Sequence, residues 1–160
     1  MSAVNGVVER AGRNSEQGPA TPLTLSGRRM SGLDEYNRRT MTIRERITAY
    51  LHAIESRDLD AVATHLHPEV IVTEHPNKIS PAGKTYDRGE LRAAGERGKT
   101  LLASERYAVR SMIVEGDRAA VQIEWTGTLH DGRAMTGVIC SIIELRDGLI
   151  WRQEQYDCFP

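Results

Sequence analysis

The chain has 160 residues, of which 39% are hydrophobic and 27% are charged, and its formal net charge is −1. This length suits one globular domain with its own core, and the small net charge argues against a nucleic-acid-binding surface. No apolar run approaches the length of a membrane span, and no N-terminal apolar segment resembles a secretory signal. We therefore expect a cytoplasmic protein that binds neither nucleic acid nor membranes.

The first 40 residues differ in composition from the rest of the chain. They are rich in Gly, Ser, Asn, Arg and Thr, and they show no sustained apolar periodicity. Such segments do not bury enough apolar surface to offset the entropy of ordering. We predict a disordered extension over residues 1–40 and a single domain over residues 41–160.

Three helices are predicted in the first two thirds of the domain. Thr42 and Glu45 form a capping-box pattern ahead of apolar residues at helical spacing. A second, short helix is expected to start at Asp58 and to end at Pro68. Asp87 has a glutamate three residues later, which predicts a third helix running to about residue 102.

Three glycine turns then recur at 16-residue intervals, at Gly116, Gly132 and Gly148. Asp and Gly between apolar, β-branched runs are a strong hairpin signal, because glycine accepts the positive φ of such turns. A first short strand is expected at residues 70–73, followed by a loop over residues 76–86. The four later strands are predicted at about residues 105–114, 118–129, 133–146 and 149–157.

This order of elements predicts an α+β fold in which a curved antiparallel sheet wraps around three helices and leaves an internal pocket. Residues 137–143 are apolar on both strand parities, which indicates that both faces of this strand are covered. The helices cover one face only. We therefore expect a homodimer joined sheet to sheet.

Three segments resemble a known superfamily. They are Arg57-Asp58-Leu59-Asp60, the segment at residues 70–76, and the ending at residues 147–157. Together with the element order, they resemble the SnoaL-like and ketosteroid-isomerase-like branch of the nuclear-transport-factor-two-like superfamily. The resemblance implies a cone-shaped α+β domain that acts on small apolar molecules without a cofactor.

The resemblance also implies site residues. The tyrosine on the first helix of the steroid isomerases falls on Tyr50, and their carboxylate base at the end of the first strand falls on Glu74. Their third position, a protonated aspartate, falls on Ser141, which is not an acid. In the cyclase branch a late aspartate acts in acid–base chemistry, and Asp157 is the nearest match.

Strand parity supports Glu74 independently of the resemblance. Glu74 shares a face with Val70 and Val72, so that an apolar cavity there would desolvate its carboxylate and make it a stronger base. The alternative is a strand-end acid in water. His75 is expected to point to the opposite face unless the strand bulges. It is either a second proton-transfer group or a loop histidine.

The pocket walls are expected to come from the later strands. Trp125 and Ile139, with Val72, would supply apolar walls, although core packing explains Trp125 equally well. The last strand is unusually polar, as expected either for an edge strand in water or for a pocket mouth that includes Tyr156. No metal is expected, because no ligand spacing supports one.

We expect acid–base chemistry at a carbonyl or hydroxyl group: isomerisation, dehydration or cyclisation. Glu74 would accept the proton, Tyr50 and Ser141 would stabilise the oxygen, and Asp157 or His75 would return a proton. One alternative is a domain of the same fold that binds a ligand or dimerises without catalysis. The other is an epoxide hydrolase that uses two acids and Arg152.

Overall fold

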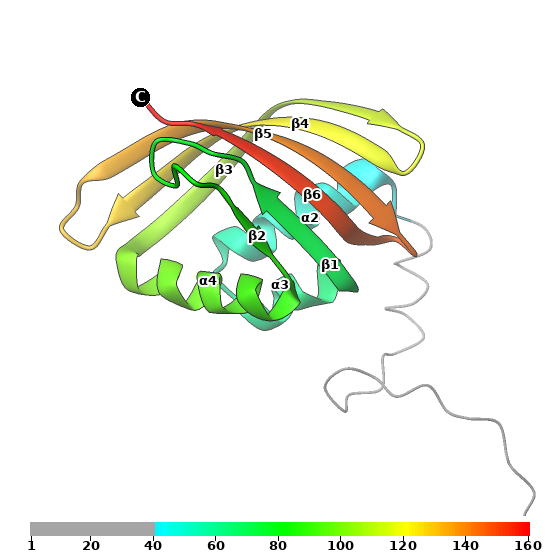
Figure 1. Ribbon diagram of the computed structural model, residues 1–160, viewed down its shortest axis with the longest axis horizontal. Helices are drawn as coiled ribbons and strands as arrows, with labels where there is room; N and C mark the ends of the chain where they lie inside the picture. Colours follow the sequence, from blue (N-terminus) through cyan, green and yellow to red (C-terminus); the bar gives the residue numbers. More distant parts are fainter. Residues whose placement is uncertain (1–40) are drawn as a thin grey trace, which may run out of the picture.

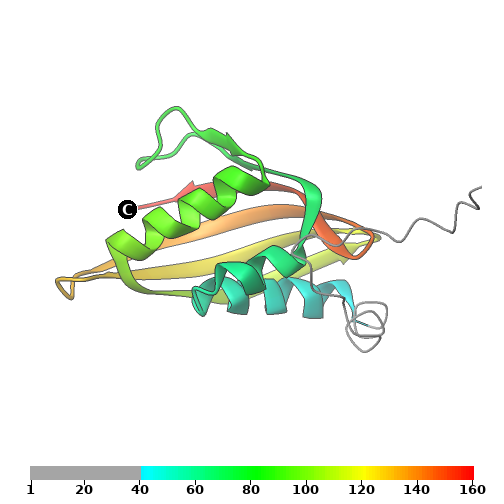
Figure 2. The same cartoon turned by 90° about the horizontal axis from the view of Figure 1, so that it is seen from below.

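The computed structural model describes residues 41–160, so the extension expected at residues 1–40 lies outside the described part of the chain. The domain has an α+β architecture in which three helices cover one face of a six-stranded, curved sheet (Figures 1 and 2). The fold class predicted from the sequence is confirmed. The helices are α2 (Ile43–Glu55), α3 (Leu59–His65) and α4 (Arg88–Leu101). The strands are β1 (Leu66–Glu74), β2 (Lys84–Tyr86), β3 (Leu102–Glu115), β4 (Arg118–Leu129), β5 (Ala134–Arg146) and β6 (Leu149–Cys158).

The helices begin at the predicted residues because their caps are complete. Thr42 and Asp87 each accept a hydrogen bond from the backbone N–H three residues later, and the glutamate at that position accepts one from the backbone N–H of the capping residue. Asp58 caps α3 by accepting from Asp60 N and Ala61 N, both at 3.0 Å. Each cap satisfies N–H groups that would otherwise lack a partner in the first turn.

The sheet order is β2-β1-β6-β5-β4-β3. Strands β3 to β6 form the predicted antiparallel meander, but β1 runs parallel to β6, so the sheet is mixed and not wholly antiparallel. This pairing joins segments about 80 residues apart, and Glu74 is aligned with Gln155. Local sequence patterns carry no signal for such a long-range contact.

Two details of the β1 region also differ from the prediction. Pro68 does not end α3; it lies inside β1, where the pairing with β6 skips from Leu66 to Ile71. An irregularity of this kind accommodates a residue that has no N–H to donate. Residues 84–86, expected to be loop, form β2 because they pair with residues 72–74, and three residues are too few to show a strand period.

The predicted hairpin turns are present, with positive φ at Gly116 (54°), Gly132 (87°) and Gly148 (71°). Asp147 also has a positive φ of 52°, so the Asp147-Gly148 pair has the type I′ character that matches strand twist. These turns fix the register of β3 to β6.

We call the sheet face covered by the helices the concave face, and the opposite one the convex face. The core lies on the concave face, where Ile123, Ile143 and Ile150 are each at most 2% exposed. On the convex face of β5, Val138 is 41% exposed and Cys140 is also exposed. Within residues 41–160 no helix is both long and apolar enough to cross a membrane.

Candidate active site

Glu74 ends β1 with its side chain on the concave face, alternating with the buried Val70 and Val72. Its Oε2 accepts a hydrogen bond from the Tyr86 hydroxyl at 2.9 Å, and its Oε1 accepts one from Asn77 Nδ2 at 2.8 Å. Burial, followed by the hydrogen bond to Glu74, raises the pKa of Tyr86 to about 12. Tyr86 therefore stays protonated near neutral pH, and both donors orient the Glu74 carboxylate.

Asp157 lies on the neighbouring strand, two residues beyond the partner of Glu74, and faces the same side. Gln155 Nε2 donates to its Oδ2 at 3.0 Å, whereas its Oδ1 is buried and has no hydrogen-bond partner within residues 41–160. Burial raises the pKa of Asp157; the hydrogen bond from Gln155 opposes this, and the negative charge of Glu74 adds to it. The two carboxyl groups are therefore electrostatically coupled.

A row of amides along β6 supports Asp157. Gln153 is 7% exposed, and its Nε2 lies 3.3 Å from Ser141 Oγ and 3.2 Å from Gln155 Oε1, donating to both. Gln155 in turn donates to Asp157. Gln153 Oε1 is also buried without a partner in the described chain, so the concave face of β6 presents two unsatisfied acceptors.

His75 lies on the face opposite Glu74, as its strand parity predicts, and Tyr156 lies beside it, so neither side chain reaches the two acids. Their rings stack on the convex face with centroids 4.2 Å apart, and Glu154 accepts from Tyr156 at 3.0 Å and lies 3.2 Å from His75 Nε2. Successive strand residues point to opposite faces, so these side chains are separated from Glu74 by the sheet. The hydrogen bonds from His75 and Tyr156 lower the pKa of Glu154.

Tyr50 is 5% exposed on α2, and burial raises its pKa to about 12. It lines a cavity of about 140 Å³ between the helices and β3, and neither Glu74 nor Asp157 lines that cavity. The structure thus brings Glu74 and Asp157 together and places Tyr50 in a separate hollow. The cavity is lined by Tyr50, Ile54, Arg57, Leu59, Val62, Leu66, Leu91, Gly95, Lys99 and Glu105.

The expected wall residues lie on the concave face. Val72 is 6% and Ile139 is 5% exposed, both within the core. Trp125 is half-buried, meets Phe159 edge to face at 5.9 Å, and donates from Nε1 to Glu105 Oε2 at 3.4 Å.

Glu105 and Tyr107 are concave-face residues that the sequence reasoning missed. The Tyr107 hydroxyl donates to Glu105 Oε2 at 2.8 Å, and burial holds the pKa of Tyr107 well above its usual range. The register of β3 shifts between Val109 and Ser111. Odd-numbered residues therefore face the core before the shift, and even-numbered residues such as Met112 face it after the shift. Without the bulge, the parity of Met112 would have placed both residues outside.

Arg152, the arginine of the epoxide-hydrolase alternative, lies away from both acids. It is exposed on β6, with its guanidinium 4.4 Å from the centroid of Trp151, and it lines an open groove of about 490 Å³ that contains neither Glu74 nor Asp157. Within residues 41–160, no group of three or more His, Cys, Asp or Glu side chains is arranged to hold a metal ion.

Comparison with known proteins agrees with this architecture. The family model of the SnoaL-like domain matches residues 47–153, about two thirds of the chain. The chain belongs to the SnoaL-like domain family. No curated protein matches the sequence of this SnoaL-like domain significantly.

Solved structures resemble the SnoaL-like domain throughout its length. An NTF2-like protein of unknown function from Burkholderia pseudomallei is 27% identical with a TM-score of 0.61, over 73% of this chain and 89% of that one. TerC, crystallised with polyporic acid, is 26% identical with a TM-score of 0.61, over 73% and 90%. IdmH, a putative polyketide cyclase from Streptomyces antibioticus, is 19% identical with a TM-score of 0.61, over 71% and 90%. The identity to IdmH supports a common fold only.

Proposed function

We propose that this SnoaL-like domain is a small-molecule enzyme that moves protons next to a carbonyl or hydroxyl group without a cofactor, as in isomerisation, dehydration or cyclisation. The observation that carries the proposal is Asp157, whose buried Oδ1 has no partner in the described chain and whose pKa is raised. A buried carboxyl with a raised pKa exchanges protons closer to neutral pH than an exposed one does.

Asp157 and Glu74 differ in a way that suits two roles. Both oxygens of Glu74 already accept a hydrogen bond, from Tyr86 and Asn77, whereas one oxygen of Asp157 accepts none. We therefore assign the proton transfer to Asp157 Oδ1. Burial is the main reason that the pKa of Asp157 is raised. Glu74, which the sequence favoured as the base, acts in this proposal as an oriented charge that adds to that effect.

In the proposed step, Asp157 Oδ1 takes a proton from the carbon beside a carbonyl, and the electron pair moves to the carbonyl oxygen. The proton then returns from Asp157 to a carbon or oxygen of the same molecule. Tyr50, with a pKa of about 12, is a phenol donor for an oxygen of a ligand that extends into its cavity. Val72 and Ile139 supply the dry wall that strengthens these interactions.

Exchange of α-hydrogens tests this chemistry without knowledge of the substrate. The protein is incubated in D₂O with small ketones such as cyclohexanone and 2-tetralone, and loss of the α-proton signal is followed by NMR. We expect faster exchange with protein than in buffer, and a loss of about 10²- to 10⁴-fold in the catalysed rate for Asp157→Asn. A catalysed rate that survives this substitution, or no catalysis with any ketone, would contradict the proposal.

A second candidate function is ligand binding without catalysis. The observation in its favour is that the cavity beside Tyr50 contains neither Glu74 nor Asp157. A ligand confined to this cavity would not touch either acid. Binding of a ketone without exchange of its α-hydrogens would favour this second function.

We also propose that the convex face pairs with a second copy of the chain. Val138, Ile71 and Tyr156 are each about 40% exposed on that face, at 41%, 39% and 43%. Pairing two such sheets would bury apolar surface that one chain leaves in water. Light scattering after size-exclusion chromatography tests this, with a dimer expected for the native chain and a monomer for Val138→Glu.

A further inference from the structure

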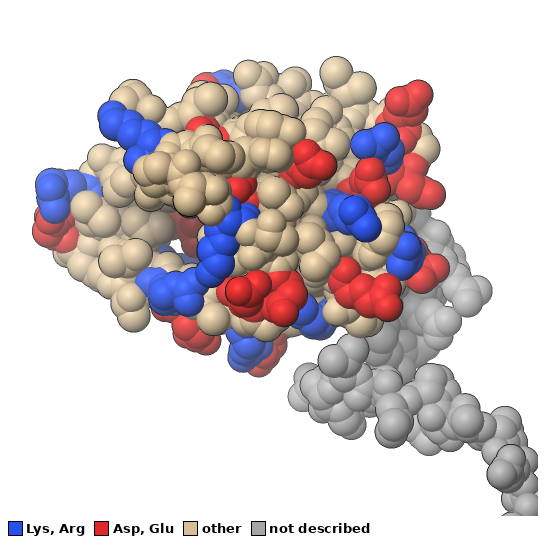
Figure 3. Space-filling view, in the orientation of Figure 1, with Lys and Arg blue, Asp and Glu red and all other residues tan. Residues whose placement is uncertain are grey.

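Most of the side chains that line the cavity beside Tyr50 are apolar, and Arg57, Lys99 and Glu105 also line it. It is bounded by residues of α2, α3 and α4 and of the starts of β1 and β3. The space-filling view shows a small gap in this face of the domain, with acidic and basic side chains near its rim (Figure 3). Its volume of about 140 Å³ is close to that of an engineered apolar cavity, about 150 Å³, that holds a benzene molecule. A ligand with a single ring therefore fits its size.

Arg57 lines this cavity in an unusual backbone conformation. It follows the C-cap of α2 with a φ of 60°, the left-handed region in which glycine is the common residue. A side chain with a Cβ is disfavoured there. Glycine would adopt this backbone conformation at a lower cost.

The Arg57 guanidinium is also incompletely paired. Its Nη1 is buried, and no hydrogen-bond acceptor within residues 41–160 reaches it. Leaving a buried donor of a charged group unsatisfied carries a desolvation penalty. An oxygen of a bound ligand would remove this penalty.

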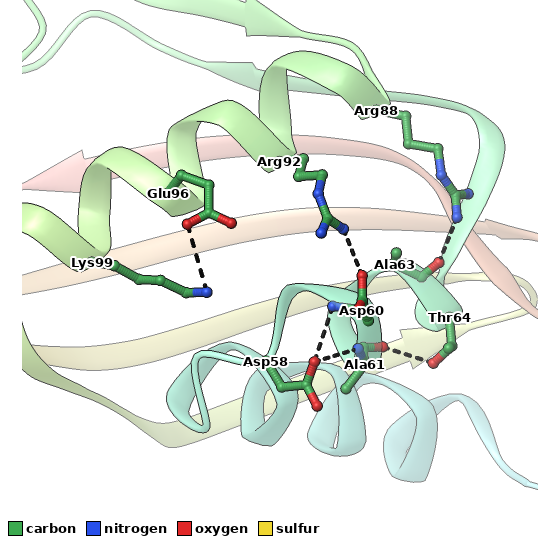
Figure 4. Close-up of polar contacts among 9 residues, drawn as sticks. All are labelled: Asp58, Asp60, Ala61, Ala63, Thr64, Arg88, Arg92, Glu96 and Lys99. Carbon is green, nitrogen blue, oxygen red and sulfur yellow. Dashed lines mark hydrogen bonds and ion pairs between the residues drawn. The ribbon is translucent and has the colours of Figure 1, made fainter. Parts of the chain in front are cut away.

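The other charged groups of the cavity already have partners. Lys99 Nζ lies 3.7 Å from Glu96 Oε2 on the surface of α4 (Figure 4), and Glu105 accepts hydrogen bonds from Tyr107 and Trp125. The remaining wall is apolar, with Leu59, Leu91 and neighbouring side chains. Of the three charged groups that line the cavity, Arg57 is the one with a buried donor that lacks a partner in the described chain.

We propose that this cavity binds a small apolar carboxylate, with its ring among the leucines and its carboxylate oxygens on Arg57. A planar guanidinium matches a carboxylate in shape and charge. The proposal does not depend on chemistry at Glu74 or Asp157, because neither residue lines the cavity.

Benzoate and benzyl alcohol are suitable probes, since both have a phenyl ring and only benzoate carries a negative charge. Binding to the full chain is measured at pH 7 by isothermal titration calorimetry. We expect benzoate to bind at least about tenfold more tightly than benzyl alcohol. Benzoate forms a charge-assisted hydrogen bond with Arg57, whereas the hydroxyl of benzyl alcohol forms only a weaker one. Arg57→Gln should remove this preference, and Arg57→Lys should keep part of it.

Three further variants test the cavity against the rest of the molecule. A Cβ on Gly95 would lie 2.6 Å from Leu59 Cδ2, so Gly95→Ala should push Leu59 into the cavity and weaken both probes. Ala also favours the α4 helix, which protects folding. Arg57→Gly should lose the preference for benzoate while the free protein melts at a higher temperature. Arg152→Gln, on the other side of the sheet, is the matched control and should bind as the native chain does.

Equal affinity for the two probes, absence of binding, or an undiminished benzoate preference in Arg57→Gln would each overturn the proposal. Benzoate binding should persist in Asp157→Asn, which abolishes the proposed catalysis. The failure of one proposal is therefore distinguishable from the failure of the other.

Discussion

The two faces of β6 carry acids of the same kind in opposite environments. On the concave face, burial raises the pKa of Asp157, and one of its oxygens is unsatisfied in the described chain. On the convex face, Glu154 interacts with His75 and Tyr156, and these hydrogen bonds lower its pKa. The environment, more than the residue type, decides which carboxyl group is poised to exchange a proton.

The largest expected effect is on activity, where substitution of Asp157 and substitution of Glu154 should give very different losses. Asp157→Asn should lower the catalysed α-hydrogen exchange by about 10²- to 10⁴-fold, because the exchanging oxygen is lost. Glu154→Gln should leave it within about twofold, since Glu154 faces away from the cavity side. NMR exchange in D₂O measures both, and similar losses in the two variants would remove the functional distinction between the faces.

The faces should also differ in their contribution to stability. Ile143 is 1% exposed on the concave face, and Ile143→Ala should lower the free energy of unfolding by about 2–5 kcal/mol through lost burial and a cavity. Its neighbour Ile142 is only half-buried on the convex face. In the monomeric Val138→Glu background, where no second copy covers the convex face, Ile142→Ala should lower the free energy of unfolding in urea clearly less than Ile143→Ala does. An equal loss in that background would contradict the difference between the faces.

A smaller effect is expected from removing one phenol on each face. Tyr86→Phe deletes a donor to Glu74 and should lower the exchange rate roughly tenfold, the size of one hydrogen bond of about 1–1.5 kcal/mol. Tyr156→Phe deletes the equivalent donor to Glu154 and should leave the rate unchanged. A loss in Tyr156→Phe equal to that in Tyr86→Phe would contradict the assignment.

The smallest expected effect is the dependence of stability on pH, which should have opposite signs for Asp157 and Glu154. The pKa of Asp157 is higher in the folded than in the unfolded chain, so its ionised form destabilises the fold, and Asp157→Asn should raise the melting temperature at pH 7. This gain should vanish below about pH 4, where the carboxyl is protonated in both states.

Glu154 has a lowered pKa in the folded chain, so its ionised form stabilises the fold at neutral pH. This stabilisation is lost as the pH falls through the pKa of Glu154 in the folded chain. Glu154→Gln should therefore lower the melting temperature slightly at pH 7 and not at low pH. Melting curves from pH 3 to pH 8 measure both variants. Shifts of the same sign in the two variants would contradict the contrast.

Much of the fold was predictable because its signals are local. The capping residues Thr42 and Asp87 set the helix starts, and the glycine turns at 116, 132 and 148 set the meander. Each signal acts through contacts within a few residues. The catalytic role predicted for Glu74 stays a prediction, although its strand parity correctly placed its side chain on the face of Val72.

The sequence alone therefore determined the caps, the turns, the α+β class and the face of Glu74. Only the tertiary structure decided that β1 pairs with β6 in parallel, which couples Glu74 to Asp157. It alone showed the bulge of β3 that turns Glu105 inward, and the buried Arg57 Nη1 that has no hydrogen-bond partner within residues 41–160. The physical reason is distance along the chain, because strand pairing and burial arise from contacts between segments whose local patterns are independent of one another.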